Sequence, residues 1–81
     1  MIRAVSELPT EVRKQLIPGV SRLKVLREWR ELSQSALARQ SNVNSQYIST
    51  LERSRRNVGK HVAKKLAQAL GVSMAILLAE Q

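Results

Sequence analysis

The sequence has 81 residues and no Cys, and its 14 Lys and Arg against six acidic residues give a formal net charge of +8. This length favours one domain with a modest core, and the lack of Cys excludes a disulfide framework and a thiolate metal site. No apolar run approaches the roughly 18 residues of a membrane span, and the N-terminus has no apolar signal segment, so we expect a cytoplasmic protein.

The first expected helix lies near residues 10–16. Leu8, Val12 and Leu16 repeat every four residues, which is the period of an α-helix. Pro18 and Gly19 then end the segment. We therefore expect one short helix before the rest of the domain.

Two further helices follow, each preceded by a serine. Ser21 is expected to cap a helix that runs to about Arg30, because a serine hydroxyl accepts a backbone N–H of the first turn. Ser33 is expected to cap the next, "QSALARQ". Both are short, so neither is stable without its neighbours.

The C-terminal half continues with helices, and no segment reads as a strand. A glycine just after an apolar helix is a common C-terminal stop. The expected helices are 45–54 capped by Asn44, about 59–70 ended by Gly71, and 74–80 capped by Ser73. The sequence thus predicts an all-α fold.

The segments "SQSALARQ" and "SQYISTLER" have the arrangement of a helix-turn-helix. We expect Ser41, Asn42 and Val43 to form a short connection between the two helices. Such a turn needs a residue in the left-handed region, which Asn42 tolerates better than most residues. The angle between the helices is expected to be filled by Leu37, Val43, Ile48 and Leu51.

Helical geometry sorts the side chains of residues 45–54 into two faces. Ile48 and Leu51 point one way, and Gln46, Ser49, Thr50 and Arg53 point the other. The outward face is neutral and hydrogen-bonding at its start and cationic at its end, which suits base edges and phosphates in a major groove. A simpler interpretation is that these polar residues are only the solvent-exposed face of an amphipathic helix. The flanking positions are Ser45 and Tyr47.

The balance of charge along the chain supports a phosphate-bearing partner. All six acids are Glu, and none lies between Arg53 and Ala79. A field of this sign favours nucleic acid, although a solvated basic surface gives the same composition. The cations of this segment are Arg53, Arg55, Arg56, Lys60, Lys64 and Lys65.

These residues carry a resemblance to a known family. The stretch from Leu23 to Leu78, with "LKVLREWRELSQSALARQSNVNSQYISTLERSRRN" and "LAQALGVSMAILL", resembles the Cro/repressor (Xre-type, lambda-repressor-like) helix-turn-helix family. The resemblance implies a compact five-helix DNA-binding domain at residues 21–81. A short N-terminal extension, residues 1–20, precedes this domain and contains one short helix. It also implies a homodimeric transcriptional repressor on double-stranded DNA.

The resemblance assigns roles to positions of this chain. Arg27 and Glu52 fall where the family keeps a salt bridge between helices, and Glu31 replaces a frequent Gly after the second helix. Gln34 falls where a glutamine touches the DNA backbone and braces the reading helix. Base reading is implied for Ser45, Gln46, Ser49 and Thr50, and backbone contact for Gln34, Tyr47, Arg53, Arg55, Arg56, Asn57 and Lys60.

The last helix is expected to join two copies of the chain. It has too many apolar side chains for one short exposed turn, so part of it enters the core and the rest forms a two-fold contact. Two reading helices would then lie about 34 Å apart on a palindromic operator. The candidates for this contact are Met74, Ile76, Leu77 and Leu78, and the sequence leaves open which of them enter the core.

Catalysis and cofactor binding have little support. There is no Asp, and the one histidine, His61, has no second ligand at helical spacing. There is also no glycine-rich phosphate loop. We expect neither an enzyme nor a protein with a cofactor or metal.

The segment from Leu8 to Gln34 also resembles the lead-in of antitoxins that pair with RelE/HigB-like ribonuclease toxins. This implies a small antitoxin that regulates its own operon, with the N-terminal stretch or Trp29 meeting the toxin. The alternative to a repressor is therefore a toxin-neutralising module in which DNA binding is secondary or lost.

Overall fold

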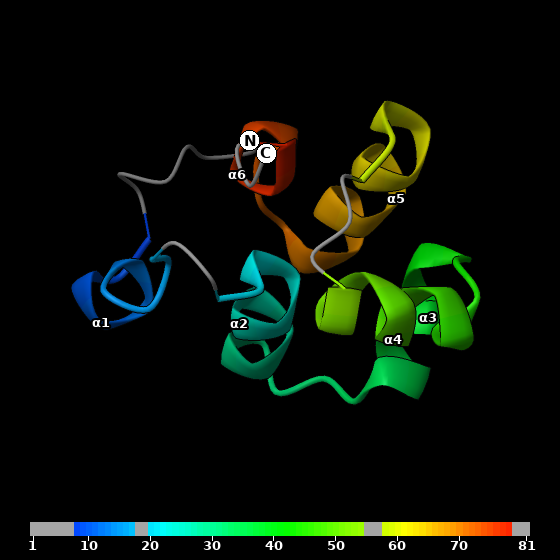
Figure 1. Cartoon of the computed structure of the whole chain (residues 1–81), viewed down its shortest axis with the longest axis horizontal. Coiled ribbons are helices and arrows are strands. Elements are labelled where there is room, and N and C mark those ends of the chain that lie inside the picture. The colour runs from blue at the N-terminus through cyan, green and yellow to red at the C-terminus, as the bar shows by residue number, and fades with distance from the viewer. Residues whose placement is uncertain (1–7, 18–19, 55–57, 79–81) are drawn as a thin grey trace.

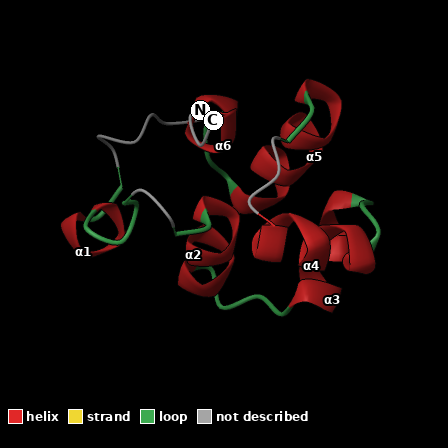
Figure 2. Ribbon diagram, in the orientation of Figure 1, coloured by secondary structure: helices red, strands yellow, loops and turns green. Residues whose placement is uncertain are grey.

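The computed structural model describes residues 8–17, 20–54 and 58–78. Within these residues the chain forms six α-helices and no strand (Figure 2), which confirms the all-α prediction. The helices are α1 (Thr10–Arg13), α2 (Arg22–Trp29), α3 (Gln34–Ser41), α4 (Ser45–Ser54), α5 (Lys60–Leu70) and α6 (Met74–Leu78).

The predicted caps are present at four of these helices. In each case a side-chain oxygen accepts a backbone N–H that has no partner within the first turn. Ser21 Oγ accepts from Lys24 (3.2 Å), Ser33 Oγ from Ala36 (3.0 Å), Asn44 Oδ1 from Gln46 (2.7 Å) and Tyr47 (3.3 Å), and Ser73 Oγ from Ala75 (3.1 Å).

Helix α1 is shorter than its apolar spacing predicts. It ends at Arg13. The N–H of Lys14 still bonds four residues back, to Thr10, but the two N–H groups after it bond only three residues back. Gln15 donates to Val12 at 3.0 Å and Leu16 to Arg13 at 3.1 Å. This tightening ends the helix one turn early, although Leu16 still packs against the core.

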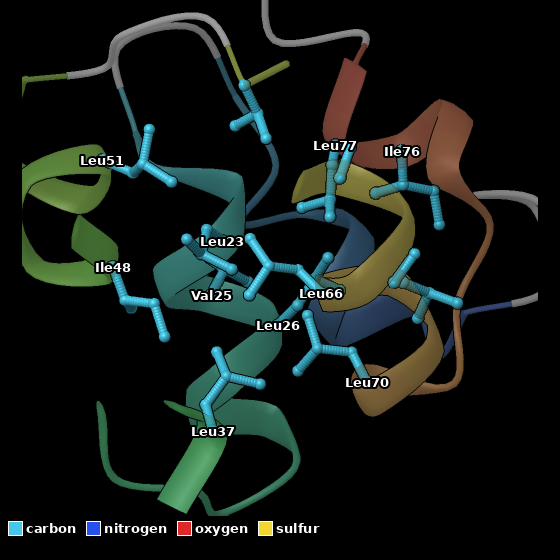
Figure 3. Close-up of a cluster of buried hydrophobic side chains, with 14 of the residues drawn as sticks. Leu23, Val25, Leu26, Leu37, Ile48, Leu51, Leu66, Leu70, Ile76 and Leu77 are labelled. Atoms are coloured by element: carbon cyan, nitrogen blue, oxygen red, sulfur yellow. The ribbon is translucent and has the colours of Figure 1, made fainter. Parts of the chain in front are cut away.

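Helix α2 lies near the middle of the molecule, and α1, α4 and α6 pack against it. In Figure 1, α3 and α4 lie on one side of α2, and α1 lies at the opposite end of the longest axis. Figure 3 shows the shared core, to which α2, α3, α4, α5 and α6 all contribute. Its fully buried large side chains are Leu23, Leu26, Leu37, Ile48, Leu66, Leu70, Val72, Ile76 and Leu77.

Two non-glycine residues in the described part of the chain adopt the left-handed conformation. Asn42 has φ 59°, as the turn requires, and the backbone N–H of Val43 donates to Ala38 at 3.2 Å. Ser41 belongs to α3 and not to the connection, which is therefore Asn42, Val43 and Asn44. Glu31 has φ 57° just after α2, which explains why glycine suits that position.

An arginine links α2 to the end of α5. Arg30 Nε donates to the backbone oxygen of Leu70 at 2.7 Å, and its guanidinium carbon lies 4.1 Å from the centre of the Trp29 ring. Gly71 ends α5 at φ 72°, and a Cβ there would come within 3.0 Å of Arg30 Nη2. The last backbone carbonyl of α5 thus accepts a hydrogen bond from an arginine that is distant in sequence.

Candidate nucleic-acid interface

Helix α4 is held against the body of the protein by two apolar side chains. Ile48 is fully buried, and Leu51 is 3% exposed. Val43, in the connection before α4, and Leu37 of α3 are buried with them, as the sequence predicts. The contact of these side chains fixes which face of α4 is turned outward.

The outward face carries the polar side chains that the sequence places there. Gln46 and Arg53 are exposed, and Ser45, Ser49 and Thr50 are half-buried. Thr50 Oγ1 donates to the backbone oxygen of Gln46 at 3.0 Å, so its proton is already used within the helix. Amide and hydroxyl groups therefore occupy the start of α4, and a cation occupies its last turn.

Tyr47 lies at the edge of this face. Its ring is half-buried and packs against the core, so part of it covers the flank of the helix-turn-helix. Lys60 is exposed at the first position of α5. Arg55, Arg56 and Asn57, predicted backbone contacts, lie outside the described residues.

A buried ion pair connects α4 to α2. Arg27 Nε and Nη2 donate to the two carboxylate oxygens of Glu52 at 2.7 and 3.0 Å, and the side chains are 11% and 4% exposed. Two further bonds complete the network: Arg27 Nη1 donates to the backbone oxygen of Leu32 at 2.8 Å, and Gln34 Nε2 donates to Glu52 Oε1 at 3.1 Å. The salt bridge is thus where the resemblance implies it.

The electrostatics of this network keep Arg27 charged. The hydrogen bond to Glu52 raises the pKa of Arg27 above its ordinary value, and this outweighs the opposing effect of burial. Since Gln34 begins α3 and bonds to the same carboxylate, Glu52 connects α2, α3 and α4 at one point. The network therefore fixes the start of α3 relative to the reading helix.

Burial divides the four residues of the last helix that were predicted for a dimer contact. Ile76 and Leu77 are fully buried within the chain, where they pack with α5 and α2. They are needed to close a small core, so they are not available to a second copy. Met74 and Leu78 are half-buried and remain partly exposed.

The bonds of Arg30 to Leu70 and of Arg27 to Leu32 were not expected from the sequence. The left-handed Gly71 and the end of α2 each indicate backbone carbonyls that need donors. Which arginine serves them depends on helix packing, since Arg30 and Leu70 are 40 residues apart. Sequence spacing carries no signal for such a pair.

A family model of helix-turn-helix domains matches residues 23–77. The match covers α3, α4 and the connection between them, together with most of α2 and α6. The chain belongs to the helix-turn-helix family of the Cro/repressor (Xre) type. Helix α1 precedes the residues that the family model matches.

Among curated proteins, an immunity repressor protein of Bacillus phage phi105 is similar to this chain. The two are 32% identical over 60 residues, which are 74% of this chain and 42% of that protein. The chain thus spans less than half the length of this relative. No solved structure gives a significant match.

The described parts of the chain lack a metal-binding cluster and a membrane-spanning helix. Residues 8–17, 20–54 and 58–78 contain no group of three His, Cys, Asp or Glu side chains that would hold a metal ion. In the same residues no helix has the length and apolar character to cross a membrane.

Proposed function

We propose that this chain is a sequence-specific DNA-binding transcriptional regulator, a repressor, that reads the major groove with α4. One observation carries the proposal: the polar face of α4 is turned outward while Ile48 and Leu51 are buried beneath it. Membership of the helix-turn-helix family and the named repressor relative support it.

The side chains of α4 have the chemistry for this task. Gln46 carries an exposed amide, which pairs with adenine through two hydrogen bonds in a major groove. Arg53 supplies a cation for phosphate at the far end of the helix. Ser45, Ser49 and Thr50 add hydroxyl groups between and beside them.

The first test is a DNA-selection experiment on the purified chain, followed by the substitution Gln46→Ala. Loss of a bidentate base contact is expected to weaken binding to the selected sequence by about 1–3 kcal/mol and to relax the preference at one base pair. Binding is measured by fluorescence anisotropy on the selected and a scrambled duplex, over a range of salt concentrations.

The matched control is Gln68→Ala, which removes another exposed glutamine, on α5. It is expected to leave both the affinity and the base preference unchanged. Wild-type binding is expected to weaken steeply as salt rises, because phosphate contacts release counterions. Equal binding to selected and scrambled DNA, or a Gln46→Ala variant with wild-type preference, would refute the base-reading role.

We further propose that two copies bind DNA together through the exposed parts of Met74 and Leu78. These half-buried side chains lie on α6. Footprinting is expected to find two protected half-sites about 34 Å apart, related by a two-fold axis. A mass that stays monomeric at every concentration, on and off DNA, would rule out this arrangement.

The second candidate function is neutralisation of a RelE/HigB-like toxin, by an antitoxin that also regulates its operon. The observation that favours it is α1, which lies outside the residues that the family model matches, yet buries Val12 against the domain. Co-purification with a small basic protein encoded next to this chain would support it. Without such a partner, α1 serves only to extend the core.

A further inference from the structure

A groove of about 260 Å³ lies between α1 and α2. Two of its lining side chains, Val12 and Val25, are buried, and the half-buried Trp29 adds an aromatic ring. Its other lining residues are Glu11, Gln15 and Glu28. The groove therefore combines an apolar floor with two exposed carboxylates.

The charge of this groove is opposite to that of the protein. The chain has a net charge of +8, yet none of the described residues that line the groove is a Lys or an Arg. Four acidic side chains fall in the described residues, and one of them, Glu52, is engaged with Arg27. Two of the other three, Glu11 and Glu28, line the groove, so it concentrates negative charge on a basic molecule.

The groove is also distant from the candidate DNA interface. Helix α1 lies at the opposite end of the longest axis from α3 and α4 (Figure 1). A ligand at the groove therefore leaves the polar face of α4 open. The acidic residues also make the groove unsuitable for a nucleic-acid backbone.

We propose that this groove binds a basic segment of a partner protein, which inserts an arginine or lysine side chain between Glu11 and Glu28. The aliphatic stem of such a side chain packs on Val12 and Val25, and its cation meets the two carboxylates. Trp29 adds to this attraction, because the ring of tryptophan attracts cations more strongly than that of tyrosine or phenylalanine. The inference stands whether or not the chain neutralises a toxin.

Trp29 already packs against one guanidinium, that of Arg30, at 4.1 Å from the ring centre. Arg30 is held elsewhere by its bond to Leu70 and does not line the groove. The acidic groups that an incoming cation meets are therefore the carboxylates of Glu11 and Glu28, and that of Glu28 also interacts electrostatically with Arg27. Gln15, whose side-chain amide donates to the backbone oxygen of Glu11 at 3.2 Å, completes the rim.

The experiment uses the full chain and the peptide acetyl-GRGRG-amide as probe. Trp29 is the single tryptophan of the sequence, so its fluorescence reports on the groove directly. The control peptide replaces both arginines with citrulline, which has nearly the same shape without the charge. Because a chain of net charge +8 repels a cationic peptide overall, saturable binding of the arginine peptide requires a local acidic site.

Four variants locate the binding site. Glu11→Gln and Glu28→Gln are each expected to weaken peptide binding about two- to five-fold, and the double variant about ten-fold. Glu31→Gln removes the same charge from an exposed side chain that does not line the groove, and is expected to have no effect. All of the changed side chains are exposed, so the variants are expected to fold as the wild type does.

The proposal is supported by saturable binding that the citrulline peptide lacks and that is weakened in the Glu11 and Glu28 variants but not in Glu31→Gln. Equal binding of the two peptides, no change in Trp29 fluorescence, or an equal loss in Glu31→Gln would overturn it. Dissociation of a dimer by the peptide would show instead that a second copy occupies the groove, and would overturn the assignment to a partner protein. None of these results bears on the proposal that α4 reads bases.

Discussion

Replacing Glu52 with Ala is expected to lower the free energy of unfolding by about 3–5 kcal/mol, because it leaves the charge of Arg27 without its partner in a largely buried site. It also removes the acceptor of Gln34. This loss is a large part of the roughly 5–15 kcal/mol that stabilises a domain. Urea denaturation followed by circular dichroism at 222 nm measures it.

Two comparisons separate the charge effect from other causes. Glu31→Gln removes the charge of an exposed carboxylate outside this network and is expected to change stability by less than about 0.5 kcal/mol. The double variant Arg27→Met/Glu52→Leu removes both charges and is expected to recover most of the stability, since apolar replacements of a buried pair are often neutral. A loss below about 1 kcal/mol in Glu52→Ala would mean that the pair behaves as an exposed one.

Replacing Ile48 with Ala is expected to cost about 2–5 kcal/mol of stability, because this fully buried side chain leaves a cavity under α4. DNA affinity is expected to fall as well, measured well below the unfolding temperature. The reason is that Ile48 helps to fix which face of α4 is turned outward, and a shifted helix presents Gln46 less well. Thermal unfolding and anisotropy on the selected duplex measure the two effects.

The chain offers a matched control in Ile17, which is 53% exposed. Ile17→Ala removes the same atoms from a surface position and is expected to change stability by no more than about 0.5 kcal/mol. If Ile48→Ala lowers stability but leaves the affinity and base preference of the folded protein intact, Ile48 supports the fold and does not position α4.

The polar face of α4 was predictable because it depends on local order alone. The helical period places Ile48 and Leu51 on one side and Gln46 and Arg53 on the other, whatever the rest of the chain does. The caps Ser21, Ser33, Asn44 and Ser73 were predictable for the same reason, since a cap acts within its own first turn. Asn42 in the turn belongs to this class too.

Predictions that depended on the packing of helices against one another were less accurate. The apolar period predicted that α1 extends to residue 16. In the structure α1 ends at Arg13, and the N–H groups of Gln15 and Leu16 bond three residues back. Composition indicated that α6 is too apolar to be exposed, but not which side chains enter the core, and Ile76 and Leu77 turned out to be buried. Both depend on the available space between neighbouring helices, which a single segment does not encode.

The sequence by itself determined the all-α class, the helix-turn-helix and the outward face of α4, because these follow from the helical period and from contacts within a few residues. Only the tertiary structure decided that Arg30 serves the end of α5, that Gln34 joins the bridge of Arg27 and Glu52, and that Glu11 and Glu28 flank one groove. These pairings join residues that are 40, 18 and 17 positions apart. Helix packing brings them together, and no local pattern specifies it.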